Sequence, residues 1–266
     1  MNQKNFEYLR DQVKFTGFGE GLEEELQKHM QQGVPAFELF HNATFGQDKT
    51  AAVLQFRRSD QGDMYFFNQY LLALRPENPS KIMEQTFYIN KGNNITLKEA
   101  YNLMSGRAVN KDLTNKEGQV YNAWLQLDFK QTEANKNYKM KQFHQNYGFD
   151  LERTLARHPI RELENEQEKG RLLESLRKGN RQLVTFFQSN GSELRRFIEA
   201  SPQYKSINVY DERMQRIRQG VKEQETTGQS VQKDHKREKQ QQVPGSEEAG
   251  AASKRRAVRK GKSIGS

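Results

Sequence analysis

The residues best suited to chemistry are basic side chains gathered near residue 260. Six of them stand within nine positions: Lys254, Arg255, Arg256, Arg259, Lys260 and Lys262. Such a group can neutralise phosphates and release the counterions condensed on nucleic acid. We therefore expect weak, non-specific contact with DNA or RNA. A solubilising tail and a segment that binds a protein partner are alternatives that the residues leave open.

Histidines and carboxylates show no pattern typical of a metal centre or an acid–base pair. The acidic residues of GLEEELQ and RELENEQEKG share their predicted helix faces with Lys and Arg. No serine stands in a nucleophile elbow. No two histidines have the i, i+4 spacing of a helical metal site; they are His29, His41, His144, His158 and His235. We expect no catalytic residues, no metal, no cofactor and no enzymatic activity.

Two glycine-containing stretches look like phosphate-binding loops but lack the required context. KGKS near the end has Arg256 where the phosphate-binding loop needs its first glycine. TGFGEG follows NFEYLRDQVKF, which has the pattern of a helix rather than the strand of a dinucleotide fold. A break between helices is the better interpretation of TGFGEG.

Composition separates a folded body from a polar tail. The mean hydropathy is −1.04, and residues 219–266 are nearly free of aliphatic and aromatic side chains, so we expect them to be disordered. This segment holds eleven Lys and Arg against six Asp and Glu, or +5 of the net charge of +9. No apolar run could span a membrane, and no signal peptide is visible. Together with the absence of cysteine, these features predict a cytoplasmic protein.

Glycines at equal spacing indicate an internal repeat. Gly33, Gly106 and Gly179 are 73 residues apart, and each follows an amphipathic run as a helix C-cap does. Each is followed by an apolar stretch, a glycine turn and further strand-like segments, which contain Val53-Leu54-Gln55, Trp124-Leu125-Gln126 and Phe197-Ile198-Glu199. In LRKGNRQLVTFF the basic residues Arg177, Lys178 and Arg181 thus mark a junction of helix and strand. They supply surface solubility or a phosphate contact.

These patterns predict an α+β fold of three tandem helix-plus-antiparallel-sheet (αβββ) units. An N-terminal helix at residues 3–14 and a first unit with an extra strand occupy 1–92. A second unit and a connecting helix in FDLERTLARHPI occupy 93–160, a third unit occupies 161–218, and the tail follows at 219–266. Such small units should pack together rather than stand alone.

Aromatic and basic residues on the predicted strands suggest a second nucleic-acid contact. MYFFNQY places Tyr65 and Phe67 on one side and Phe66 on the other, and Tyr121, Trp124, Phe143 and Tyr147 occur in the second unit. At least half of these rings must form the core. The lysines of the third strands could border an exposed sheet face: Lys139, Lys141 and Lys205. Lysines that discourage strand pairing are the alternative.

The second unit carries a family resemblance. LMSGRAVNKDLTNKEGQVYNAWLQLDF resembles an uncharacterised domain, often in tandem, of proteins encoded on conjugative and other mobile elements of Bacteroides-type bacteria. The residues that carry it are Gly106, Arg107, Ala108, Val109, Lys116, Gly118, Tyr121, Asn122, Ala123, Leu125 and Gln126. The resemblance covers about residues 1–216. It implies a bacterial cytoplasm and a mobile-element setting, and it implies no reaction.

Two functional hypotheses follow from these observations. The first is a non-enzymatic accessory protein of a mobile element that binds nucleic acid weakly and largely through charge. The second is an adaptor whose sheet faces or strand edges engage another protein of the element or of the host. Sequence alone leaves the partner and the oligomeric state undetermined.

Overall fold

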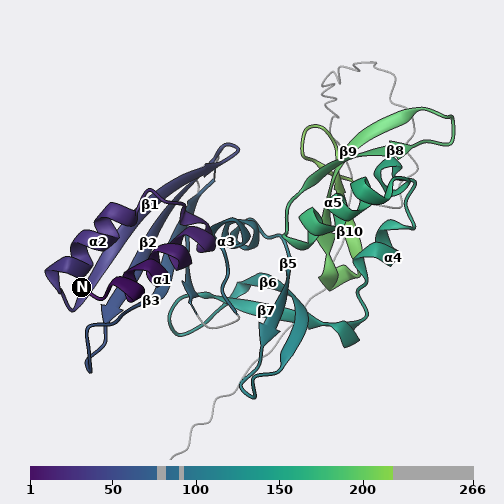
Figure 1. The fold of residues 1–266 in the computed structure, drawn as a ribbon. Coiled ribbons are helices and arrows are strands. Elements are labelled where there is room, and N and C mark those ends of the chain that lie inside the picture. The colour runs from purple at the N-terminus through teal and green to yellow at the C-terminus, as the bar shows by residue number, and fades with distance from the viewer. Residues whose placement is uncertain (77–81, 90–92, 218–266) are drawn as a thin grey trace, which may run out of the picture. The chain divides into compact units, whose positions relative to one another are not determined.

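A computed structural model describes residues 1–76, 82–89 and 93–217, and these residues form an α+β fold with three antiparallel sheets (Figure 1). Contacts define Met1–Gly220 as one compact unit. Residues 219–266, for which we predict disorder, lie outside the described residues, and so does the cluster of six basic residues from Lys254 to Lys262.

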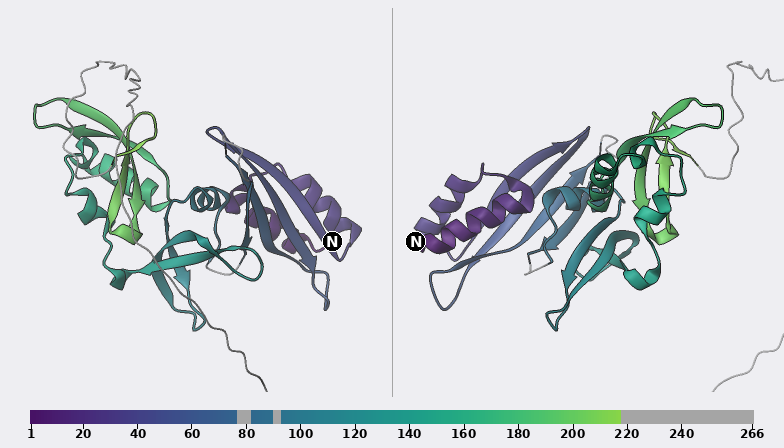
Figure 2. Two further views of the ribbon diagram at one scale, coloured as in Figure 1. Left: turned by 180° about the vertical axis from the view of Figure 1, so that it is seen from behind. Right: turned by 45° about the vertical axis from the view of Figure 1, so that its right-hand side comes forward.

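The first sheet is a meander of four strands. It is preceded by α1 (Gln3–Val13), the π-helical turn η1 (Lys14–Phe18) and α2 (Glu23–Gln32). α2 ends at Gly33, which adopts a left-handed conformation with φ +68°, as the repeat pattern predicts. The helices lie on one face of the sheet in both views of Figure 2. The strands are β1 (Ala36–Phe45), β2 (Asp48–Arg58), β3 (Tyr65–Arg75) and β4 (Met83–Tyr88), in that order.

The second sheet has three strands and two buried faces. The helix α3 (Leu97–Met104) precedes it and begins with a capping box formed by Thr96 and Glu99. On one face of the sheet, Leu125 belongs to the core shared with the first sheet. On the other face, Trp124 belongs to a second core. The strands are β5 (Val109–Thr114), β6 (Val120–Thr132) and β7 (Tyr138–His144), in that order.

The third sheet has four strands in the order β11-β10-β9-β8. Its inner face packs into the second core with α4 (Leu151–Leu155) and α5 (Glu166–Arg177). Three short 3-10 turns, η2 (Gln145–Tyr147), η3 (Arg161–Leu163) and η4 (Pro202–Tyr204), join these elements. The strands are β8 (Gln182–Phe187), β9 (Glu193–Ser201), β10 (Ser206–Tyr210) and β11 (Arg216–Ile217).

Two elements differ from the sequence-based expectation. The helix expected in FDLERTLARHPI is only α4, because the chain beyond it pairs with the edge of β8: the Phe187 N–H donates to the Pro159 carbonyl, and Ile160 bridges Phe186. The third sheet also gains a short fourth strand, β11, which pairs with Val209 and Tyr210. Both differences arise from pairing between distant residues, which local patterns do not encode.

A buried amide joins α3 to the C-terminal end of α5. Asn102 is fully buried, and its Nδ2 donates to the Lys178 carbonyl at 2.7 Å and to Asn180 Oδ1 at 3.0 Å. Its Oδ1 accepts from the Arg107 guanidinium at 2.6 Å. This arrangement ties the helix of the second sheet to the helix of the third.

Candidate nucleic-acid interface

The lysines predicted on β7 have an acidic neighbour. Lys139 stands opposite Asp128 in the register of β6 and β7, and Lys141 Nζ lies 2.8 Å from Asp128 Oδ2. The hydrogen bonds from Lys141 and from the Lys130 N–H hold the pKa of Asp128 below its usual value. Lys141 is therefore already partly neutralised.

The prediction that Lys205 lies on a strand is wrong, because Lys205 is the left-handed residue between η4 and β10. It follows η4 with φ +50°, and its ammonium lies 4.8 Å from the centre of the Tyr147 ring. The Tyr147 hydroxyl donates to the Gln203 carbonyl at 2.8 Å. The structure thus pairs Lys205 with an accessible aromatic ring, and it gives the three predicted lysines different partners.

Most of the aromatic residues considered for stacking belong to the core. Tyr65 and Phe67 are 2% and 3% exposed, whereas Phe66 between them is 52% exposed, as the alternation predicts. Trp124 and Phe143 are buried in the second core. Among the described residues, these buried rings are not accessible for stacking a base.

The outward face of the third sheet provides two partly exposed rings instead. Ile198 on β9 and Val209 on β10 belong to the second core, and their neighbours Phe197 and Tyr210 face outward directly opposite each other. Burial alternates along β10, whereas the last four residues of β9 are all buried. Leu183 on β8 and Arg216 on β11 complete this row across all four strands. The row Leu183, Phe197, Tyr210 and Arg216 is called the outer row below.

A polar network beside the outer row is organised by a buried carboxylate. Glu199 is only 5% exposed and accepts four hydrogen bonds, two from Arg181, one from Asn208 and one from Tyr210. Arg216 in turn donates to Asn208 Oδ1. Every polar atom of the Glu199 carboxylate is thus engaged, as a buried charge requires.

Arg181 is held beside this face by Glu199 and Tyr210. Its Nε and Nη2 lie 3.2 and 3.1 Å from Glu199 Oε2, and its guanidinium carbon lies 4.4 Å from the centre of the Tyr210 ring. Burial, followed by the hydrogen bond to Glu199, raises the pKa of Tyr210 to about 12. The hydroxyl therefore stays protonated at neutral pH and keeps the ring oriented.

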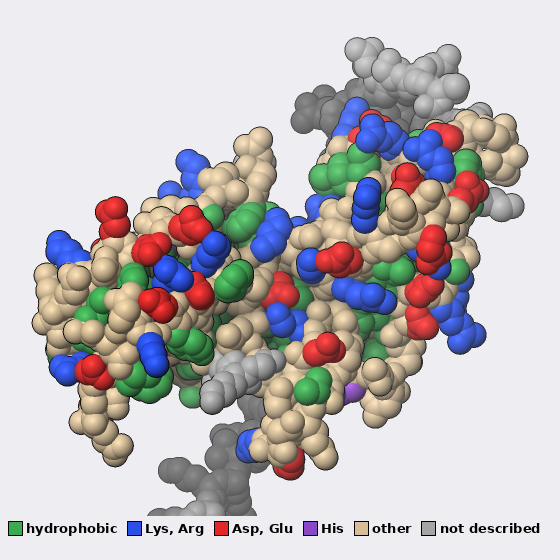
Figure 3. All heavy atoms as spheres, in the orientation of Figure 1, with side chains coloured by type: hydrophobic (Ala, Val, Ile, Leu, Met, Phe, Trp, Pro, Cys, Tyr) green, Lys and Arg blue, Asp and Glu red, His purple; other side chains and the backbone are tan. Residues whose placement is uncertain are grey.

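The charges around the outer row favour an anionic ligand. Arg195 is exposed on the same face, opposite Thr185, and Arg216 is exposed in the row itself. The carboxylates of this face are neutralised: Glu199 by Arg181, and Glu193 by Arg161 at 3.0 Å. On the face of the molecule that Figure 3 presents, charges of both signs are interspersed.

Sequence reasoning missed this surface although its signal was present. It placed Arg181 at a junction of helix and strand, with surface solubility or a phosphate contact as its role, and it aligned Phe197, Ile198 and Glu199 without deciding which of them faces outward. The alternation in ELRRFIEAS and SINVY predicts two faces, but only the register shows that Phe197 and Tyr210 are opposite each other.

Comparisons of the chain with protein-family models, curated proteins and solved structures give no match. Within residues 1–76, 82–89 and 93–217, every helix is too short or too polar to span a bilayer. The same residues contain no group of three or more side chains that could hold a metal ion.

Proposed function

We propose that this chain is an accessory protein of a mobile genetic element that binds single-stranded nucleic acid weakly through the outward face of the third sheet. The observation that carries the proposal is the cross-strand pair of partly exposed rings Phe197 and Tyr210 on the outward face. Exposed Arg195 and Arg216 lie beside this pair, and Glu193 and Glu199 on the same face are already paired with other arginines. The mobile-element setting rests on the family resemblance of residues 1–216.

The chemistry of single-stranded recognition supports this surface. Bases stack on exposed aromatic rings and on arginine planes, with about 1–3 kcal/mol per stacked base, and cations along the groove follow the phosphates. Phe197 offers a ring, and Arg181 offers a guanidinium plane fixed by Glu199. Arg195 and Arg216 are placed to follow the backbone of the bound strand.

Binding of labelled single-stranded DNA and RNA, of about 12 nucleotides, tests the proposal by fluorescence anisotropy across a range of salt concentrations. We expect Phe197→Ala to weaken binding about fivefold or more, since one stacking ring is lost. Arg195→Gln should reduce the slope of log affinity against log salt by about one.

Phe66→Ala is the matched control, because Phe66 is an exposed aromatic residue on a different sheet, 52% accessible. Equal losses in Phe66→Ala and Phe197→Ala, or affinity independent of salt, would refute the proposed interface. A chain stopped at Arg218 shows how much of the affinity depends on Lys254 to Lys262.

We also propose that the three segments are variants of one αβββ unit. Gly33, Gly106 and Gly179 end the helices with φ of +68°, +81° and +78°, which supports the alignment. In an experimental structure, superposition of the three segments should place these glycines at equivalent positions. Superposition only with the glycines out of register would contradict common descent.

A further inference from the structure

One end of β6 lacks a partner on one side. β5 pairs with β6 from Val120 to Leu125, but β7 pairs with β6 only from Ala123 onward, where Ala123 stands opposite His144. Beyond His144 the chain turns away through η2, so Val120, Tyr121 and Asn122 have no paired strand on that side. In an antiparallel sheet, successive residues direct their N–H and C=O groups alternately to the two neighbours. At least one of these three residues therefore directs both groups to the open side.

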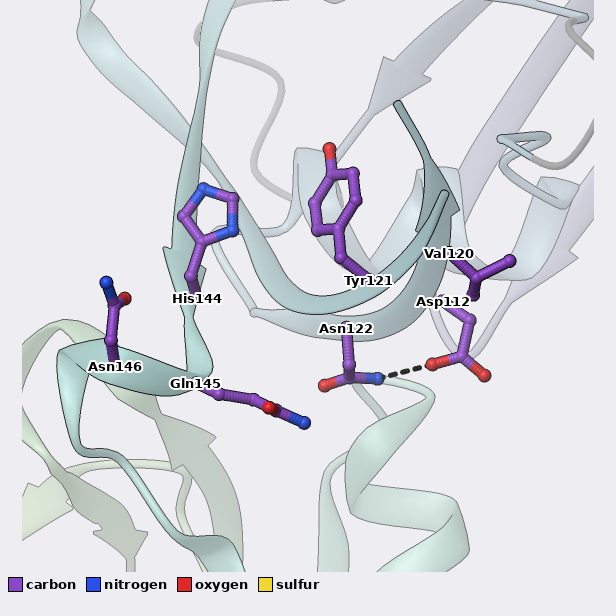
Figure 4. A pocket seen from close by; sticks show the side chains of 7 residues that line it. All are labelled: Asp112, Val120, Tyr121, Asn122, His144, Gln145 and Asn146. Carbon is purple, nitrogen blue, oxygen red and sulfur yellow. Dashed lines mark hydrogen bonds between the residues drawn. The ribbon is translucent and has the colours of Figure 1, made fainter. Parts of the chain in front are cut away.

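A pocket of about 640 Å³ occupies this place (Figure 4). The unpaired end of β6 lines it on one side, and His144, Gln145 and Asn146 line it on the other. The pocket is thus in the position that a continued β7 would fill. It is a gap in a sheet rather than a hollow between side chains.

Side chains close parts of three other strand edges in the described residues. The Asn137 amide pairs with both backbone groups of Thr86 on β4, and the Glu162 carboxylate accepts from the Thr185 N–H on β8. The Asn93 amide pairs with both backbone groups of Thr114 on the free side of β5. Such closure is the usual protection of an edge, and no described side chain supplies it beside Val120 to Asn122.

The two sides of the gap have different chemistry. In Figure 4, Tyr121 and His144 stand side by side, with ring centres 5.3 Å apart, and Asn122 and Asp112 lie on the other side. Asp112 Oδ1 accepts from Asn122 at 2.8 Å. No lysine or arginine lines this pocket, and Arg177 lines an adjoining pocket that Asp112 and Asn122 also line. One side is therefore aromatic, and the other carries the exposed carboxylate of Asp112.

We propose that an extended segment of a partner protein adds to β6 in this gap and continues the place of β7. Its central residue is basic and faces Asp112, and its neighbours are apolar and face Tyr121 and His144. Main-chain hydrogen bonds to the unpaired end of β6 provide the affinity, and the alternating side chains provide selectivity. This site is independent of the nucleic-acid interface on the third sheet.

The test uses the full chain labelled with ¹⁵N and the capped peptide acetyl-Thr-Val-Lys-Val-Thr-amide, followed by amide chemical shifts. We expect saturable shifts at residues 120–122 and 145–146. The same peptide with its three central amides N-methylated cannot donate to a strand, and a peptide with Glu in place of Lys would be repelled by Asp112. Neither should bind measurably.

Asp112→Asn should weaken binding of the Lys peptide about two- to fivefold, as expected for an exposed ion pair, while it keeps the oxygen that accepts from Asn122. Glu117→Gln is the matched control, since Glu117 is an exposed carboxylate in the turn between β5 and β6 but does not line the pocket. Absence of shifts at millimolar peptide would overturn the proposal. So would shifts confined to other residues, equal binding of the N-methylated peptide, or equal affinity of Asp112→Asn.

Discussion

At the scale of single residues, Gly179 shows how closely the second and third segments approach each other. A Cβ at this position would lie 2.8 Å from the Ala108 carbonyl oxygen and 2.8 Å from Val109 Cγ2. Gly191 has nearly the same φ, +81° against +78°, but nothing lies within 4 Å of its Cβ position. Comparing Gly191 with Gly179 therefore separates the loss of stability caused by backbone strain from the loss caused by a packing clash.

We expect Gly191→Ala to lower the free energy of unfolding by about 1–2 kcal/mol, because alanine is strained at positive φ. Gly179→Ala should cost about 1–3 kcal/mol more, since the methyl group also collides with the chain after α3. Urea denaturation of the two variants measures the difference. Equal stability would show that the contact between Gly179 and Ala108 relaxes without cost.

At the scale of elements, side-chain amides join two sheets. β4 and β7 are edge strands of different sheets, and their contact is reciprocal: the Asn137 amide pairs with the backbone of Thr86, and the Gln85 amide pairs with that of Tyr138. Each amide both donates and accepts, as a strand residue would. Loss of either amide leaves a backbone N–H and C=O without a partner in a partly buried joint.

Asn137→Ala should therefore destabilise the protein by about 1–3 kcal/mol in denaturant unfolding. A double-mutant cycle with Gln85→Ala should give a coupling energy of about 0.5 kcal/mol or more, because the two pairs support the same joint. Gln131→Ala, at an exposed position on the same hairpin, is the control and should change stability little. If the changes in the free energy of unfolding caused by Asn137→Ala and Gln85→Ala are strictly additive, the two amide pairs act independently.

At the scale of the whole described molecule, the second sheet makes two cores depend on each other. Leu125 and Trp124 are neighbours on β6, yet Leu125 belongs to the first core and Trp124 to the second. Loss of either core exposes one face of the same sheet. We therefore expect the described residues to unfold in one cooperative transition.

Trp124 is the single tryptophan of the chain, so its fluorescence reports on the second core. Leu54→Ala removes a fully buried side chain of the first core and should cost about 2–5 kcal/mol. We expect this substitution to lower the midpoint of thermal unfolding seen by Trp124 fluorescence by the same amount as the midpoint seen by circular dichroism. An unchanged fluorescence transition would show that the two cores unfold separately.

Local patterns predicted the helices and strands of this protein well. Gly33 ends α2, and the alternation in MYFFNQY correctly places Phe66 on the opposite face from Tyr65 and Phe67. These features depend on interactions within a few residues of the chain. For the candidate interface, the sequence predicted basic residues beside aromatic rings on a sheet. The lysines that it named, Lys139, Lys141 and Lys205, are not the residues of the outer row.

The sequence by itself determined the α+β class, the positions of most helices and strands, and the concentration of positive charge after residue 218. These properties follow from propensity, capping and periodicity, which act locally. Only the tertiary structure decided that Phe197 and Tyr210 share the outward face of the third sheet, that Glu199 holds Arg181 there, and that β6 extends beyond the end of β7. Register and burial depend on contacts between residues far apart in the chain, and no local pattern encodes which strand lies beside which.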